Sequence, residues 1–207
     1  MLRPQGFDEF IEASGCTAVT PTDIWDKIRG YYEGRPYHSW THIGRGWELL
    51  HIQEVISYSH FHLGLLGGWL LHDAIYDPKR GDNEVMSAKL ARKLYIDWGM
   101  GLAIALASEN FILATDHRNE PIGEDQCVIA DVDLAELAVD WEQFQINTQN
   151  VRKEYDFVSD QGFAEGRAKF LQSLLERKTI YKTPYFQQEF EAKARKNIER
   201  SIQELTA

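Results

Sequence analysis

The most constraining feature of this sequence is an apolar run that ends in two polar residues. Leu63 to Leu71 contains no charged side chain, and His72 and Asp73 follow it directly. A helix that is apolar on nearly all sides is typical of the centre of a helical bundle, and this run is too short to span a bilayer core of about 30 Å. Burying a histidine beside a carboxylate costs free energy unless something pairs them. The sequence therefore predicts a buried central helix with a polar centre at its end.

The remaining apolar pattern is helical. Thr20 to Asp23 combines a capping threonine, a proline at the first helical position and an acid at the third, which is typical of a helix start. Asn83 is expected to cap a later helix that ends before Gly99, and Asp160 and Thr183-Pro184 give further start signals. No stretch shows sustained apolar and polar alternation, and no Asn-Gly or Asp-Gly turn occurs.

These signals predict an all-α fold, a compact bundle of about eight to ten helices. The first helix is expected from residue 21 to between Gly30 and Gly34. The others are expected over about 40–57, 63–75, 83–98, 101–115, 124–138, 140–156, 160–177 and 184–205.

Charge and cysteine content limit the class of partner and the compartment. Acidic residues exceed basic ones by ten (32 − 22), a balance that argues against duplex nucleic acid as the main partner. Cys16 and Cys127 form no metal-finger spacing, which favours two thiols in a reducing compartment. The N-terminal residues lack the apolar segment of a signal peptide. We therefore expect a cytoplasmic protein that binds no membrane.

Histidines and carboxylates gather in patterns that suggest a metal site. Six of the seven histidines lie between positions 38 and 72, and two of them, His38 and His42, are spaced by one helical turn. Asp131 and Asp133 interrupt an otherwise apolar segment. One divalent cation would satisfy His42, His72, Asp73 and Asp133 together. Mixed imidazole and carboxylate ligands suit Mn²⁺, Fe²⁺, Co²⁺, Ni²⁺ or Zn²⁺ better than Ca²⁺.

The order H…HD…D resembles the HD superfamily of metal-dependent phosphohydrolases, and more narrowly a bacterial group of predicted metal-dependent HD phosphohydrolases. The segments that carry the resemblance are YYEGRPYHSWTHI (31–43), GGWLLHDAIYDPKRGDNEVMSA (67–88), ILATDHR (112–118), DVDLAEL (131–137) and EGRAKFLQSLLERKTIYKTPYF (165–186). The resemblance implies a single HD-type domain over residues 1–207, with the C-terminal helices, about 140–207, packing on the metal-binding core.

The resemblance also implies a ligand set for one divalent metal ion (Mn, Fe, Co, Ni, Mg or Zn). His42 matches the first motif histidine, His72 and Asp73 match the HD pair, and Asp133 matches the final aspartate. Asp131 is its rival, since residues two apart on a helix point in different directions and only one is expected to bind the ion. His38 is the alternative to His42, and otherwise has a supporting or phosphate-binding role.

Three further residues are candidates for acid-base chemistry. Asp77 lies four residues after Asp73, where a continuing helix would place it on the same face. Glu84 is either a supporting acid or a first-turn acid favoured by the helix dipole. His117 either contacts the leaving group or a second metal ion, or makes a structural hydrogen bond.

Five residues are candidates for binding the substrate. Arg35 is the first expected phosphate clamp because its planar guanidinium matches phosphate oxygens, and Lys79 and Arg80 are the second. For each of them a plain surface charge is the alternative. His38 joins them in its supporting role. Trp40 has the shape to stack on a base, although most tryptophans belong to the core.

The resemblance implies an enzyme that hydrolyses a small phosphorylated substrate, with a nucleotide favoured, by attack of metal-activated water on phosphorus. The main alternative is a non-catalytic HD-fold sensor that holds a nucleotide or a metal. A third reading, a structural helical adaptor, makes the histidine and aspartate pattern a coincidence. A homodimer is left open.

Overall fold

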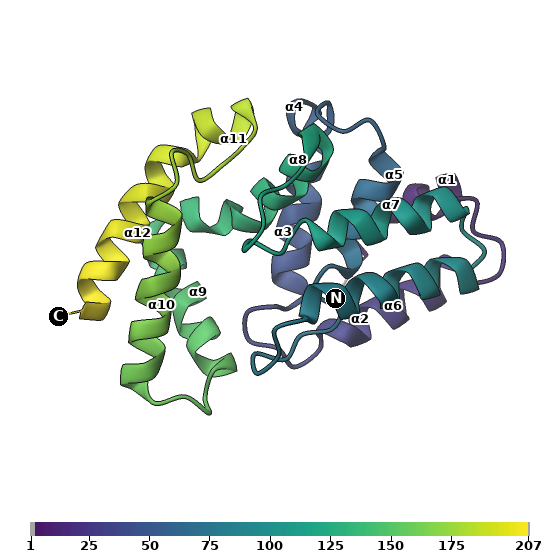
Figure 1. The fold of residues 1–207 in the computed structure, drawn as a ribbon. Helices are drawn as coiled ribbons and strands as arrows, with labels where there is room; N and C mark the ends of the chain where they lie inside the picture. Colours follow the sequence, from purple (N-terminus) through teal and green to yellow (C-terminus); the bar gives the residue numbers. More distant parts are fainter. Residues whose placement is uncertain (1–2, 207) are drawn as a thin grey trace. The chain divides into compact units, whose positions relative to one another are not determined.

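A computed structural model describes residues 3–206, and every regular element in that range is a helix (Figure 1). The all-α prediction is therefore confirmed. The first helices are α1 (Phe7–Ala13), α2 (Pro21–Tyr32), α3 (Trp40–Leu50), α4 (Gln53–Ile56), α5 (His62–Leu71) and α6 (Asn83–Asp97). They are followed by α7 (Leu102–Leu113), α8 (Gly123–Leu134), the 3₁₀ helix η1 (Ala135–Ala138), α9 (Trp141–Glu154), α10 (Asp160–Leu175), α11 (Pro184–Glu189) and α12 (Glu191–Thr206).

The described residues form more α-helices than the eight to ten helices expected, because two expected helices are interrupted and one was missed. The helix expected over 40–57 breaks after Leu50, where His51 turns its ring back onto the carbonyl of Trp47 at 2.7 Å. The helix expected over 184–205 breaks at Phe190. The missed helix is α1, although its buried Phe7, Phe10 and Ile11 follow helical spacing.

Helix starts agree better with the sequence signals than helix ends do. Thr20 caps α2 by accepting the Asp23 N–H at 3.2 Å, and Gly99 follows α6 with φ +77°, the conformation that glycine adopts most readily. Asn83 is an exception. It is the first residue of α6 and not its cap, because its amide binds the preceding loop instead.

The chain divides into two compact units, residues 1–132 and 133–207, and the boundary falls inside α8. In the first unit, α7 runs along both α5 and α6, and α5 also packs on α3 (Figure 1). Its interior contains Trp47, Trp69 and Tyr95, all with exposed fractions of 1% or less. The apolar helix α5 is thus enclosed by its neighbours, as the sequence predicted.

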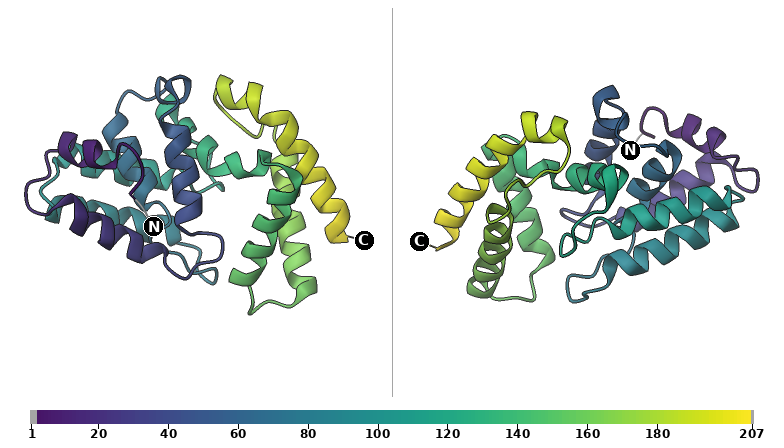
Figure 2. Two further views of the ribbon diagram at one scale, coloured as in Figure 1. Left: turned by 180° about the vertical axis from the view of Figure 1, so that it is seen from behind. Right: turned by 45° about the horizontal axis from the view of Figure 1, so that its top comes forward.

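The second unit is built around α10 and α12, which lie side by side in both views of Figure 2. Asn197 on α12 donates to the carbonyls of Leu137 and Val139, which fixes the 3₁₀ helix η1 against α12. The expectation of a single domain over residues 1–207 stays a prediction.

α5 is the most apolar helix, yet it has only ten residues. Within residues 3–206, no helix combines the length and apolar character needed to cross a membrane.

Candidate metal centre

The end of α5 orients the imidazole of His72. The ring nitrogen Nδ1 lies 2.8 Å from the backbone carbonyl oxygen of Trp69. A carbonyl oxygen can only accept a hydrogen bond, so Nδ1 carries the proton and donates it. In the neutral ring the lone pair is therefore on Nε2, which is the state that a metal ligand requires.

Side chains from other elements hold the turn that carries Asp73. The hydroxyl of Tyr32 donates to the carbonyl of Leu70 at 2.8 Å, and Arg35 donates to the carbonyls of Asp73 and Ala74, the latter at 2.8 Å. These bonds satisfy carbonyl groups that a helix end leaves without backbone partners. Burial raises the pKa of Tyr32 well above its ordinary value, with a contribution from the charge of Asp73, so its hydroxyl stays a donor.

Three ligand-type atoms of the first unit meet at this turn. Nε2 of His72 lies 3.0 Å from Oδ2 of Asp73 and 3.2 Å from Nε2 of His42, and the His42 to Asp73 distance is 3.8 Å. His42 comes from α3 and Asp133 from the last turn of α8. The four residues each offer one ligand atom, and these atoms all lie within 4.8 Å of one another.

The donor set fits a divalent ion. Two ligand atoms bound to one ion by bonds of about 2.1 Å lie about 3.0 to 3.4 Å apart at octahedral or tetrahedral angles, and two of the three measured separations fall in this range. His42 and His72 are nearly fully buried, with exposed fractions of 3% and 1%. Two imidazole nitrogens that face each other beside a carboxylate therefore have the arrangement of a metal site, and this group matches the four residues predicted as ligands.

The two rival ligands of the sequence analysis stand outside this group. Asp131 is buried, but it is not one of the four residues that converge. The ring of His38 stacks on Tyr76 at 3.7 Å, and its centroid is 6.2 Å from that of His42. His38 thus lies beside the centre, where its predicted supporting role stays a prediction.

The helical placement predicted for Asp77 is wrong, because α5 ends at Leu71 and the chain then forms a loop. α5 stops here because side chains bind the carbonyls that backbone N–H groups would bind if the helix continued. The His72 ring binds the carbonyl of Trp69, and the Tyr32 hydroxyl binds that of Leu70. Asp77 is exposed, and its carboxylate accepts the backbone N–H of Lys79 at 2.9 Å. A direct role of Asp77 at the metal centre stays a prediction. The helical geometry on which that prediction was based is absent.

Two residues of α6 hold this loop in place. Asn83 accepts the N–H of Asp77 and donates to its carbonyl, at 3.1 and 2.9 Å. The fully buried hydroxyl of Ser87 does the same for Ile75, at 3.0 and 3.1 Å. The NExxSA segment therefore acts as a clamp on the loop that follows the His-Asp pair.

Glu84 lies in the first turn of α6 and is half-buried. Burial raises the pKa of Glu84 above its ordinary value. The negative charges of Asp116 and Asp73 raise it further, while Arg118, 3.8 Å from the carboxylate, lowers it. Arg118 is itself bound to Asp116 at 2.7 and 3.0 Å, and it holds the pKa of Asp116 below the usual range. Glu84 therefore keeps its proton to a higher pH than an ordinary glutamate, and the charge of Asp73 contributes to this shift.

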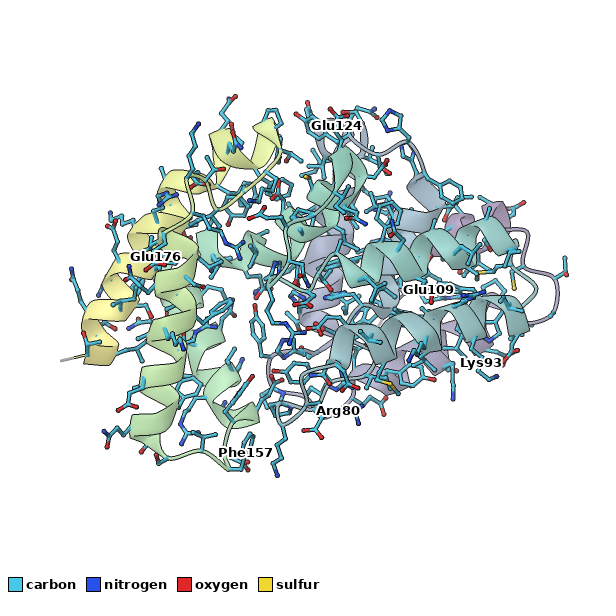
Figure 3. The ribbon with its side chains drawn as sticks, viewed as in Figure 1. Arg80, Lys93, Glu109, Glu124, Phe157 and Glu176 are labelled. Atoms are coloured by element: carbon cyan, nitrogen blue, oxygen red, sulfur yellow. The ribbon has the colours of Figure 1, made fainter. Side chains whose placement is uncertain are left out.

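The predicted substrate-binding residues lie in two places. Lys79 and Arg80 are exposed on the loop before α6. Arg80 (Figure 3) pairs with Asp82 at 2.8 and 2.9 Å. Arg35 and Trp40 line a cavity of about 260 Å³. Its other lining residues are Arg29, Tyr32, Glu33, Gly34, Ser39 and Thr41.

Arg35 and Trp40 also have structural contacts of their own. Arg35 binds the turn of Asp73, and Trp40 packs edge-on against Trp25 at 4.4 Å with an exposed fraction of 7%. Their substrate roles stay predictions. His117 lies in the turn after α7 and is half-buried, and its predicted role is likewise untested.

No role at the site was predicted from the sequence for Tyr32 or Trp69. Both contact the turn through backbone carbonyls, and Trp69 also contacts the ligand rings. The available signal was position: Trp69 precedes His72 by three residues, so its carbonyl lies within reach of the His72 ring.

Comparisons with known proteins add no assignment. No protein-family model matches this chain, and a search of curated proteins finds no match. The class that the described residues define is therefore an all-α protein with a histidine and aspartate group suited to a metal ion.

Proposed function

We propose that this chain is a divalent-metal-dependent phosphohydrolase of the HD superfamily, acting on a small phosphorylated substrate, with a nucleotide as the favoured class. The observation that carries the proposal is the convergence of His42, His72, Asp73 and Asp133, in the chain order H…HD…D. The cytoplasmic location and the small-molecule substrate belong to the same proposal.

The chemistry of the site supports this choice. A bound divalent ion lowers the pKa of a coordinated water and neutralises charge on phosphoryl oxygens. The chain's own residues supply the rest. The backbone carbonyl of Trp69 keeps the His72 ring in the ligand tautomer, the Trp69 indole stacks on that ring, and Arg35 binds the backbone carbonyl of Asp73.

Glu84 is the proposed proton donor. Its raised pKa keeps a proton on its carboxyl group at higher pH than an ordinary glutamate would, and a leaving oxygen needs a proton as its bond to phosphorus breaks. The cavity lined by Arg35 and Trp40 is the proposed place for the non-reacting part of the substrate.

The test is a screen of nucleotides and generic phosphoesters with the purified protein loaded with Mn²⁺. We expect release of phosphate, pyrophosphate or a nucleotide. Asp73→Ala should reduce turnover to below about one hundredth, because loss of a ligand costs at least as much as loss of an outer-shell partner. Asp97→Ala, which removes an exposed carboxylate of α6, is the matched control and should keep full activity.

The same screen separates the enzyme from the sensor. If the metal-loaded protein turns over none of these compounds but gains thermal stability from one of them, the enzyme proposal fails and the sensor is favoured. Equal activity of the wild type and Asp73→Ala would contradict the proposed site.

A further inference from the structure

Trp69 lies against both histidines of the metal centre. Its ring stacks on His72, with centroids 4.2 Å apart and planes inclined by 22°. The centroid of His42 is 5.2 Å away. Trp69 is fully buried, so one side of each imidazole faces a fixed indole and not solvent.

The Trp69 indole contacts α3 at two places, through its Nε1–H and through its six-membered ring. Its Nε1–H donates to the carbonyl of Ile43, the residue after His42, at 2.8 Å. Its six-membered ring crosses α3 at Gly46, where an added Cβ would lie only 1.9 Å from Cζ2. Gly46 therefore provides the space that lets the indole cross α3. Trp69 thus ties α3, which carries His42, to α5, which ends just before His72.

The backbone of Trp69 contributes as well. Its carbonyl accepts the Nδ1–H of His72 at 2.8 Å. One residue therefore sets the tautomer of one ligand and limits the ring rotation of both. Outer-shell partners of this kind orient ligands and strengthen metal binding.

We infer that Trp69 is a positioning residue of the metal centre, which aligns Nε2 of His42 and of His72 before an ion binds. This inference rests on one part of the proposed function, the binding of a divalent ion, and does not depend on the substrate. A residue that only packs the core would affect folding stability when it is replaced. A positioning residue should, in addition, weaken metal binding by more than the loss of stability explains.

Trp47 offers a matched control. It is equally buried, its Nε1–H donates to the carbonyl of Gln5 at 2.8 Å, and its ring lies 4.9 Å from His51. His51 is not one of the four converging residues. Each of Trp69→Phe and Trp47→Phe therefore removes a buried indole and its Nε1–H donor from the first unit. Only Trp69→Phe removes an indole that contacts the histidines of the metal centre.

The experiment is calorimetric titration of the full chain with Mn²⁺, together with the Tm of each metal-free variant. We expect both variants to lower the Tm by similar amounts. Trp69→Phe should weaken Mn²⁺ binding about 10- to 100-fold, whereas Trp47→Phe should change it less than about threefold.

Several results would overturn the inference. Equal affinity of Trp69→Phe and the wild type would leave Trp69 as core packing only, while the metal site itself would stand. An equal loss of affinity in both variants would trace the effect to general destabilisation. A wild type that binds no Mn²⁺ would overturn both the inference and the proposed function.

A second measurement applies if Trp69→Phe does not fold. The wild type is labelled with 5-fluorotryptophan, and its six ¹⁹F signals are assigned from the other five Trp→Phe variants, which leaves Trp69 by elimination. On titration with diamagnetic Zn²⁺ the Trp69 signal should shift most. A shift no larger than that of Trp47 would contradict the positioning role.

Discussion

At the scale of single residues, Glu84 has surroundings that favour its neutral form. Burial raises its pKa in the folded protein, with a smaller contribution from neighbouring acids. A carboxyl group with a raised folded-state pKa stabilises the fold below its unfolded pKa, about 4.3. That contribution is lost as the pH rises through the folded pKa. Ionised Glu84 is therefore a cost to the folded state.

Glu84→Gln should remove this cost. We expect the variant and the wild type to have similar free energies of unfolding near pH 4, and the variant to become the more stable as the pH rises to 8. Urea denaturation at several pH values, with a chelator present, measures the difference. Glu109→Gln, which alters a partly exposed ion pair with Arg92, should show no such gain. A difference that stays constant with pH would contradict the account.

The four converging residues could be predicted at this scale for two reasons. Their order along the chain, H…HD…D, resembles a known ligand pattern, and an imidazole or carboxylate is costly to bury without a partner. The choice of Asp133 over Asp131 agrees with the group that converges. The place of Asp77 could not be predicted, because it depended on where α5 ends. That end is set by Tyr32, Arg35 and the His72 ring, of which two are distant in sequence.

At the scale of elements, α3 and α5 approach closely enough that one position tolerates no side chain. Gly46 of α3 faces the indole of Trp69, and a Cβ there would overlap the ring. Gly30 of α2 is also helical, yet an added Cβ there meets no atom within 4 Å. The two glycines therefore have opposite expected responses to the same substitution.

Gly46→Ala should lower the free energy of unfolding by about 1–3 kcal/mol or more, since the buried ring must be displaced. Gly30→Ala should raise it by about 0.5–1 kcal/mol, because alanine is the better helix former. Urea denaturation of both variants measures the effects. If Gly46→Ala were as stable as the wild type, the close contact of α3 and α5 would be wrong.

Helix starts were more predictable than helix ends. Thr20-Pro21 and Thr183-Pro184 mark helix starts that the sequence displays, since a proline occupies the first position of each helix. The break after Leu50 and the end of α5 depend on side chains that bind backbone carbonyls, and such contacts exist only once the chain has folded.

At the scale of the whole molecule, the all-α class follows from helical periodicity along most of the sequence. The division into residues 1–132 and 133–207 has no marker in composition, since it falls within the continuous helix α8. The acidic balance of the chain does not conflict with the proposed anionic substrate, because the proposed cation would supply positive charge where that substrate would meet the site.

The central claim is that one divalent ion binds among His42, His72, Asp73 and Asp133. Anomalous diffraction from crystals grown with Mn²⁺ tests it most directly. The account predicts one strong peak per chain, about 2.0 to 2.3 Å from Nε2 of His42, Nε2 of His72 and a carboxylate oxygen of Asp73. No peak at this position, or Mn²⁺ bound only at other residues, would contradict it.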